Sequence, residues 1–397
     1  MGYDTIFSSI KSICLFVFVL VVTTSAQSDR CPFDLLYHLG DGVFDNGNSI
    51  ANMPYGSRLP AARLPYGETD PGRPTGRWCD GLLDIDYGAQ GLGFEQITPY
   101  LSPNVSSANA IMFAVARSPV LDRPFFTARN IRIPPYAASL NVQMSWFKKY
   151  LNTICSTRED CADKLANALF LFGDVEANDI TFGLIQGKSM EEVQTYIPYI
   201  TEAQIDAARE AIQLGATRVI LPGNAPIGCY PFVLTELASN NTTDYDDIGC
   251  LRTINDLITL KNNDLQQAIN DLSQEFPDIF IMYADFFNSE TSLIRETALS
   301  GKFFFFFFAY SFALNAYSAN FTLQACCGTG GRYNYNSRRF CGSPGVPVCS
   351  DPNQYLFWDG IHLTQEANRR LSTALAAGAL VQLNCTISQS SQLWASI

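Results

Sequence analysis

The segment Leu35-Leu36-Tyr37-His38-Leu39-Gly40-Asp41-Gly42-Val43-Phe44-Asp45-Asn46 joins a short apolar run to a polar, glycine-rich turn. The run 35–39 has the length and composition of a buried strand, and Gly40 ends it. Further short apolar runs predict four more strands, at 111–115, 168–172, 218–221 and 279–283.

Long stretches with helical periodicity alternate with these strands. They predict helices at 140–151, 202–214, 251–276 and 364–377, the last of them capped by Thr364. Alternation of this kind predicts an α/β fold, a three-layer α/β/α sandwich around a mainly parallel sheet. Because ligands bind beyond the carboxyl ends of such strands, we expect the functional residues in the loops after Leu39, Val115 and Phe172.

The N-terminus has the pattern of a secretory signal peptide. Lys11 precedes an apolar run at 13–22, and the small residues Thr24-Ser25-Ala26 follow it. A membrane anchor is the alternative, but the run is shorter than the ~20 apolar residues that span a bilayer. We therefore predict a signal peptide at 1–26, a single domain at 27–397 and a secreted protein, extracellular, apoplastic or vacuolar. The apolar run 303–308 is interpreted as core or lid packing.

The composition of the chain argues against several classes of binding partner. The formal net charge of -12 argues against nucleic acid and anionic membranes. Cys14 leaves with the signal peptide, so eleven of the twelve cysteines remain and at least one thiol is free. Short loops favour the pairs Cys155–Cys161 and Cys341–Cys349. No metal site and no cofactor are expected, because the cysteine spacings are not zinc-like and histidines are few. Glycosylation sequons lie at Asn104, Asn240, Asn241, Asn320 and Asn384.

Several motifs occur in a characteristic order along the chain. They are Gly40-Asp41-Gly42, 72–77 (GRPTGR), 222–229 (PGNAPIGC), 326–331 (CCGTGG), 341–345 (CGSPG) and Trp358-Asp359-Gly360-Ile361-His362. Together they resemble the plant GDSL (SGNH) esterase/lipase family, which has a flavodoxin-like α/β/α fold. Residues 31–34 (CPFD) and 65–69 (PYGET) are most similar to its acetylajmalan-esterase-like branch, which cleaves acetyl esters of alkaloids.

The resemblance implies roles for individual residues. In the family, a serine in Gly-Asp-Ser attacks the ester, a histidine removes its proton and an aspartate orients the histidine. Asp359 and His362 match the last two, and Gly42 stands at the serine position. Asn178 matches the oxyanion asparagine, although the preceding glycine-rich residues have become Glu176 and Ala177. Arg117 stands at the position of an oxyanion glycine, unless it is a surface residue of a shifted loop.

Loss of the serine leaves three functional hypotheses. Because glycine offers no nucleophile, serine-dependent hydrolysis is predicted to be lost. The preferred hypothesis is a repurposed enzyme in which His362 is a general base, with Asp359, Asn178, Gly42 and Arg117 supporting isomerisation, elimination or cyclisation of a carbonyl metabolite. The second is an inactive pseudo-esterase that binds a small ligand or a partner. The third is a residual ester hydrolase in which His362 activates water. These hypotheses leave open whether the chain is an enzyme. His38, within the run 35–39, is expected to be a packed or surface residue.

Overall fold

A computed structural model describes residues 31, 33–51, 54–300, 321–383 and 385. Its centre is a six-stranded sheet of order β2-β3-β1-β4-β5-β6, in which every pair of neighbours is parallel. The strands are β1 (Leu35–Leu39), β2 (Thr98–Pro99), β3 (Ala110–Met112), β4 (Ala168–Phe172), β5 (Arg218–Pro222) and β6 (Phe280–Ala284). The expected α/β fold is confirmed, and the two-residue β2 was not predicted.

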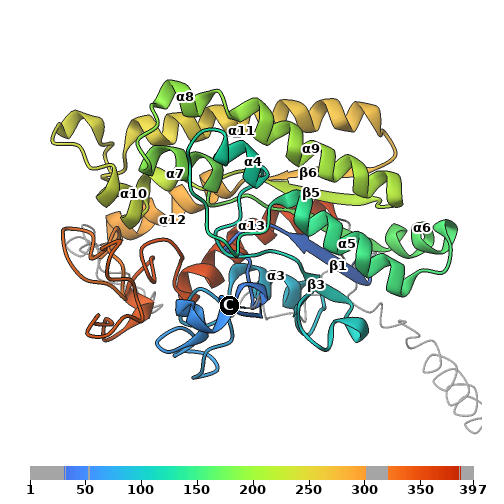
Figure 1. The fold of residues 1–397 in the computed structure, drawn as a ribbon, viewed down its shortest axis with the longest axis horizontal. Coiled ribbons are helices and arrows are strands. Elements are labelled where there is room, and N and C mark those ends of the chain that lie inside the picture. Colours follow the sequence, from blue (N-terminus) through green and yellow to red (C-terminus); the bar gives the residue numbers. More distant parts are fainter. Residues whose placement is uncertain (1–30, 32, 52–53, 301–320, 384, 386–397) are drawn as a thin grey trace, which may run out of the picture.

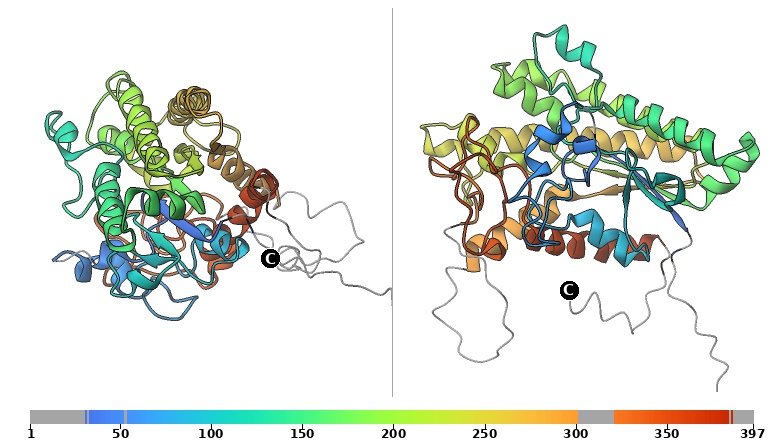
Figure 2. Two further views of the ribbon diagram at one scale, coloured as in Figure 1. Left: turned by 90° about the vertical axis from the view of Figure 1, so that its right-hand side faces the viewer. Right: turned by 60° about the horizontal axis from the view of Figure 1, so that its bottom comes forward.

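Helices cover both faces of this sheet (Figures 1 and 2). On one side, α9 packs against α5 and α11, and on the other α13 packs against α3. The described helices are α2 (Asn48–Ala51), α3 (Asp84–Gly91), α4 (Arg123–Thr127), α5 (Leu140–Ile154), α6 (Arg158–Ala166), α7 (Asn178–Ile185), α8 (Met190–Gln194), α9 (Ile197–Leu214), α10 (Pro231–Glu236), α11 (Arg252–Glu275), α12 (Phe286–Ser300) and α13 (Gln365–Gln382). No helix in the described part of the chain is long and apolar enough to cross a bilayer.

The strand order determines where the functional loops meet. From β1 the chain passes to β2 and β3 on one side of it, and then to β4 on the other. The carboxyl ends of β3, β1 and β4 therefore flank the point where the strand order reverses, which is where α/β sheets bind ligands. The predicted strand to Val115 ends at Met112 in the ladder. The backbone still follows β1, because Phe113 N–H donates to His38 and Val115 N–H donates to Gly40.

Local sequence signals account for the ends of two helices. Ser139 accepts a hydrogen bond from Val142 N–H and begins α5. Thr364 accepts from Ala367 N–H at 3.2 Å and caps α13, as predicted. His38, inside β1, is fully buried against Phe44, which confirms the packed-histidine interpretation.

The disulfides partly correct the sequence-based pairing. Cys155–Cys161 is confirmed. The prediction of Cys341–Cys349 was wrong: Cys341 pairs with Cys327, and Cys349 pairs with Cys326. Two further bonds join Cys31 to Cys385 and Cys229 to Cys250, while the predicted free thiol is the buried Cys79. The predicted signal peptide, the run 303–308 and the sequons at Asn320 and Asn384 lie outside the described residues.

Candidate functional site

The loop after β1 is fixed by hydrogen bonds to its neighbours. Gln143 on α5 is buried, and its side-chain amide accepts from Gly40 N–H and donates to Gly40 C=O, both at 2.8 Å. Asp41 Oδ2 accepts from the N–H groups of Val175 and Glu176 at 2.7 and 2.8 Å. Asp45 Oδ2 accepts from Ala116 N–H at 2.8 Å. The loops that follow β1, β3 and β4 therefore form one hydrogen-bonded unit.

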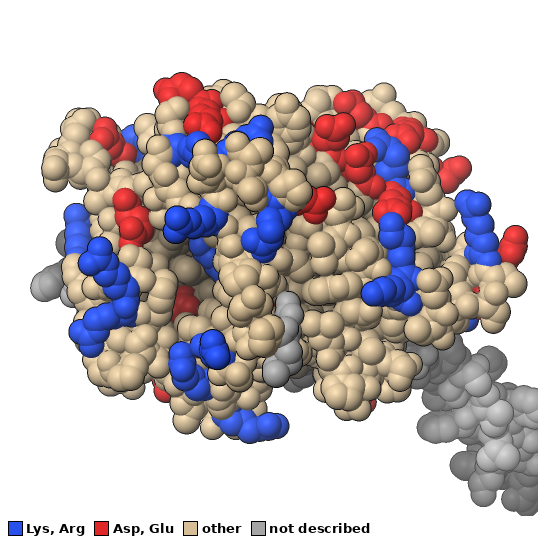
Figure 3. Space-filling model, in the orientation of Figure 1, with Lys and Arg blue, Asp and Glu red and all other residues tan. Residues whose placement is uncertain are grey.

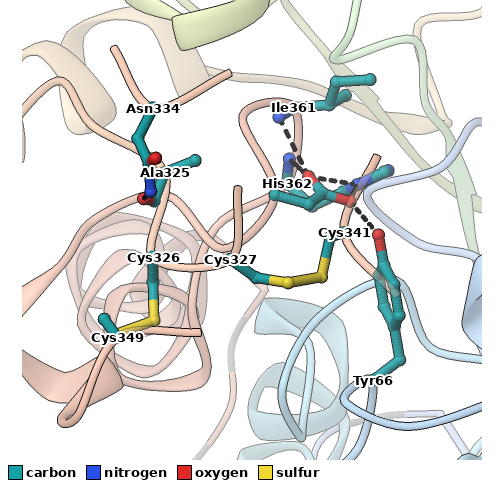
Figure 4. The surroundings of a disulfide bond; sticks show 10 residues. Tyr66, Ala325, Cys326, Cys327, Asn334, Cys341, Cys349, Ile361 and His362 are labelled. Atoms are coloured by element: carbon teal, nitrogen blue, oxygen red, sulfur yellow. Dashed lines mark hydrogen bonds and ion pairs between the residues drawn. A yellow bond between two sulfur atoms is a disulfide. The ribbon is translucent and has the colours of Figure 1, made fainter. Parts of the chain in front are cut away.

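Two disulfides support the loop that carries Asp359 and His362 (Figure 4). Cys326 N–H donates to Phe357 C=O, and Cys327 N–H donates to Trp358 C=O. Because Cys326 and Cys327 are each cross-linked, the segment leading to Asp359 is anchored to a covalently closed region.

His362 lies in this loop and has partners both within the loop and outside it. Its Nδ1 lies 2.8 Å from Asp359 Oδ2, and Asp359 Oδ1 accepts from His362 N–H at 2.9 Å. Tyr66 O–H donates to Asp359 Oδ2 at 2.7 Å, and this bond is the dashed line that starts at the Tyr66 hydroxyl in Figure 4. The Trp78 ring packs against the imidazole with 5.4 Å between ring centroids. All four side chains are buried, so the imidazole has a fixed orientation.

The Nε2 edge of the His362 ring contacts a carboxylate from the loop that follows β4. Glu176 Oε1 lies 3.1 Å from His362 Nε2, an ion-pair contact without the alignment of a hydrogen bond. Glu176 Oε2 accepts from Asn178 Nδ2 at 2.8 Å. A Cβ added to Gly42 would lie 2.5 Å from Glu176 Oε1 and 2.9 Å from His362 Nε2. The Glu176 carboxylate thus lies beside Gly42, in a place that a side chain at residue 42 would need.

Opposite charges stabilise one another in this buried cluster. Burial disfavours the imidazolium, but the Asp359 charge and hydrogen bond, together with Glu176, raise the pKa of His362 to about 10. Burial alone would raise the pKa of Glu176, yet His362, Arg117 and Asn178 lower it below its ordinary value. The pKa of Asp359 is also lowered, because the interactions with His362 outweigh burial. At neutral pH the arrangement is an imidazolium between two carboxylates.

The backbone at Arg117 and Ala177 has a conformation that favours glycine. Arg117 has φ 57° and Ala177 has φ 48°, in the left-handed region. The Arg117 guanidinium lies 4.8 Å from the Phe182 ring centroid and 5.8 Å from that of Phe232. Its Nη1 is buried without a hydrogen-bond partner. Residues that favour the right-handed region have thus been accommodated on a glycine-like backbone next to the Glu176 carboxylate.

Comparison with known proteins agrees with this geometry. Residues 36–375 match the family described as GDSL-like lipase/acylhydrolase. The chain belongs to this family. It is 43% identical to acetylajmalan esterase of Rauvolfia serpentina, over 90% of this chain and 88% of the relative. It is 41% identical to acetylajmalan esterase 1 of the same plant, over 94% and 93%, and 36% identical to a GDSL esterase/lipase of Arabidopsis thaliana, over 96% and 99%.

The structure brings the residues selected from the sequence into one place. Gly42, Asn178 and His362 lie next to the Glu176 carboxylate, and Asp359 lies on the far side of the His362 ring. Arg117 is near enough for its charge to lower the pKa of Glu176. In the same orientation as Figure 1, Figure 3 shows a hollow with basic side chains around it and acidic atoms within it.

Sequence reasoning missed three side chains of this site. Glu176 was noted only as a departure from glycine, although a carboxylate two residues before Asn178 was itself a signal. Tyr66 lies within the family segment 65–69, and Trp78 follows the segment 72–77, but neither position marks a contact with Asp359 or His362. Within the described residues, no group of three His, Cys, Asp or Glu is placed to hold a metal ion.

The chemistry open to this arrangement follows from its charge state. A general base must be neutral and must reach the proton that it removes. With its pKa raised to about 10, His362 is charged rather than neutral at pH 7. Its Nε2 faces Glu176 rather than an open space. The site therefore holds charge more readily than it transfers a proton.

The two histidines of the chain give a direct test of this charge state. Burial lowers the pKa of His38 to about 3, so its imidazole stays neutral, whereas His362 stays charged. We expect neither imidazole to titrate between about pH 5 and about pH 8, the range of ordinary histidines. Nitrogen-15 NMR of histidine-labelled protein measures this. In Glu176→Gln, the loss of one negative charge should lower the pKa of His362. A wild-type imidazole that titrates near pH 6.5 would contradict the assignment.

Proposed function

We propose that this GDSL-family protein is a pseudo-esterase, which binds a small ligand at the family's site without hydrolysing it. One observation carries the proposal: the Glu176 carboxylate contacts His362 Nε2 and Asn178 Nδ2 at once, while Gly42 has no side chain. On this account Gly42 replaces the family's serine. The missing side chain and the new carboxylate are one change, because either a Cβ at residue 42 or the observed Glu176 position must give way.

The Glu176 carboxylate has the features of a bound acid product. Its Oε1 lies next to Gly42, where the resemblance places the nucleophile, and its Oε2 takes the hydrogen bond of the oxyanion asparagine. In an active esterase that amide stabilises the oxyanion formed from the substrate. Here a carboxylate of the chain itself occupies the donor. A substrate carbonyl can reach Asn178 Nδ2 only when Glu176 leaves.

The two enzymatic hypotheses require a different charge state and position of the same residues. Proton abstraction and direct water activation both require a neutral His362 with a free Nε2. Each therefore needs Glu176 to move and the imidazolium to lose its proton. The geometry supports binding better than either reaction.

Arg117 supplies the recognition element of the proposed binding site. Its guanidinium is partly buried beside Phe182 and Phe232, and its Nη1 has no hydrogen-bond partner. Such a group suits an ester or carbonyl oxygen flanked by apolar surface. The similarity to acetylajmalan esterase supports an ester- or carbonyl-containing small molecule as the ligand.

Restoring the nucleophile tests the proposal. Gly42→Ser alone should gain little activity on p-nitrophenyl acetate, because Glu176 remains beside residue 42 and can still accept the hydrogen bond of Asn178. Gly42→Ser combined with Glu176→Gly should raise hydrolysis about a hundredfold or more over wild type, part of the ~10⁶-fold that a serine contributes in a comparable triad. A fluorophosphonate probe should label the serine introduced at position 42 in this double variant.

The matched control is Gly42→Ala with Glu176→Gly, which adds the same Cβ without a hydroxyl. It should be as inactive as wild type. Adding His362→Ala to the active double variant should abolish turnover while leaving the fold intact. Wild-type hydrolysis equal to that of the double variant would overturn the pseudo-esterase assignment.

We also propose that the chain is secreted after cleavage of residues 1–26, leaving 27–397 as one hydrolase-fold domain. Five disulfides support an oxidising compartment, and exposed sequons at Asn104, Asn240 and Asn241 support glycosylation. Expressed in plant cells with its own N-terminus, the protein should appear in the medium or vacuole and begin at Gln27. A cytosolic product that retains residues 1–26 would contradict this.

A further inference from the structure

A cavity of about 320 Å³ lies on one face of the sheet, and it reaches Phe44 of the β1 loop without including Gly42 or Glu176 in its lining. Residues of β4, β5 and β6 line the cavity on the side of the sheet. Residues of α3 and α13 line the opposite side, and the start of α12 lies at one end. Figures 1 and 2 show α3 and α13 side by side on this face of the sheet. Its volume is within the range of small-molecule sites.

The cavity opens a central strand to solvent. Leu169 and Leu171 of β4 point to the same face of the sheet and both line the cavity. Leu169 is buried, whereas Leu171 is only partly buried. A central parallel strand is ordinarily covered on both faces. The packing of α3 and α13 thus leaves a recess over β4.

A small residue on α3 helps to form this recess. Gly88 lines the cavity in the middle of the helix, and a Cβ added there would meet only Ser372 Oγ, at 3.7 Å. A larger side chain at this position has room to enter the cavity without disturbing the helix backbone.

The charged groups of the lining have one sign. Among the described residues that line the cavity, Asp84 and Asp285 are acidic and none is Lys, Arg or His; the rest are mostly apolar. Both Asp285 oxygens accept hydrogen bonds from Asn288 at the start of α12. Asp84 is only 4% exposed, and its Oδ1 has no hydrogen-bond partner.

The buried Asp84 carboxyl lacks a cation. Burial raises its pKa to about 7, and the nearby Asp86 adds to the rise, although backbone N–H groups at the start of α3 oppose it. A carboxyl group in an apolar surrounding is stabilised in its charged form by an opposite charge within a few ångströms. The described lining does not supply one, and a bound cationic ligand would.

We propose that this cavity is a binding site for a lipophilic amine, whose ammonium group pairs with Asp84 while its rings or aliphatic body fill the apolar recess. The amine donates a charge-assisted hydrogen bond to Asp84 Oδ1. Its apolar part covers Leu171 and the inner faces of α3 and α13. This site is separate from the Gly42–Glu176 site and does not depend on the proposed function.

A matched set of three probes tests the proposal: naphthylmethylamine, methylnaphthalene and naphthylacetate. They share an aromatic body and differ in charge. The first is a cation, the second is neutral and the third is the anion of naphthylacetic acid. We expect saturation-transfer NMR and calorimetry to show binding of the amine to the full chain, weaker binding of methylnaphthalene and no binding of the anion. Asp84→Asn should weaken amine binding about ten- to hundredfold, the effect of losing a hydrogen bond to a charged group, and should leave methylnaphthalene unaffected.

Two further variants separate binding from folding. Gly88→Leu should fill the cavity and abolish binding of both amine and methylnaphthalene, with the melting temperature kept or raised because leucine favours helix more than glycine. Glu210→Gln removes the same charge beside another cavity and should leave amine affinity unchanged. Equal binding of amine and neutral probe, retained amine affinity in Asp84→Asn, or no amine binding to the wild type would each overturn the proposal.

Discussion

The contact between the Glu176 carboxylate and the His362 imidazolium is the interaction on which the rest of the site depends. It completes a buried row of charges, in which His362 lies between Glu176 and Asp359. Removing one member would leave another buried charge without its partner, which is far more unfavourable than losing a surface ion pair. Asp41 accepts a hydrogen bond from Glu176 N–H, and Tyr66 O–H donates one to Asp359; these two bonds hold the ends of the row in place.

The same contact joins residues that lie far apart in the sequence. Gly42, Arg117 and Glu176 belong to three different loops, yet they meet where the strand order reverses. A glycine at residue 42 leaves room for the carboxylate, and the Arg117 charge helps to keep it ionised. The left-handed backbone of Arg117 and Ala177 shows that the loops keep a glycine-like path while carrying larger residues. The strands and disulfides that support the site are separate from these loop residues.

The sequence predicted what depends on local pattern and on the order of motifs. The apolar runs located five strands, and Asp359, His362 and Asn178 were found where the loops meet. The sequence pattern does not predict side-chain contacts between loops. Glu176 reaches both His362 and Asn178 because Gly42 leaves space for it. The disulfide error has a similar cause. Adjacent residues in an extended segment point to opposite sides, so Cys326 and Cys327 take different partners, Cys349 and Cys341, and proximity in sequence is no guide.

Acetate binding tests whether Glu176 occupies the place of a carboxylate product, as we propose. Glu176→Gly removes the carboxylate and leaves His362 and Asn178 as free donors for a small anion. Calorimetric titration with acetate should show one site in this variant and none in the wild type, and His362→Ala in the same background should remove it. Acetate binding of equal strength to wild type and Glu176→Gly would contradict the account, as would no binding to either protein.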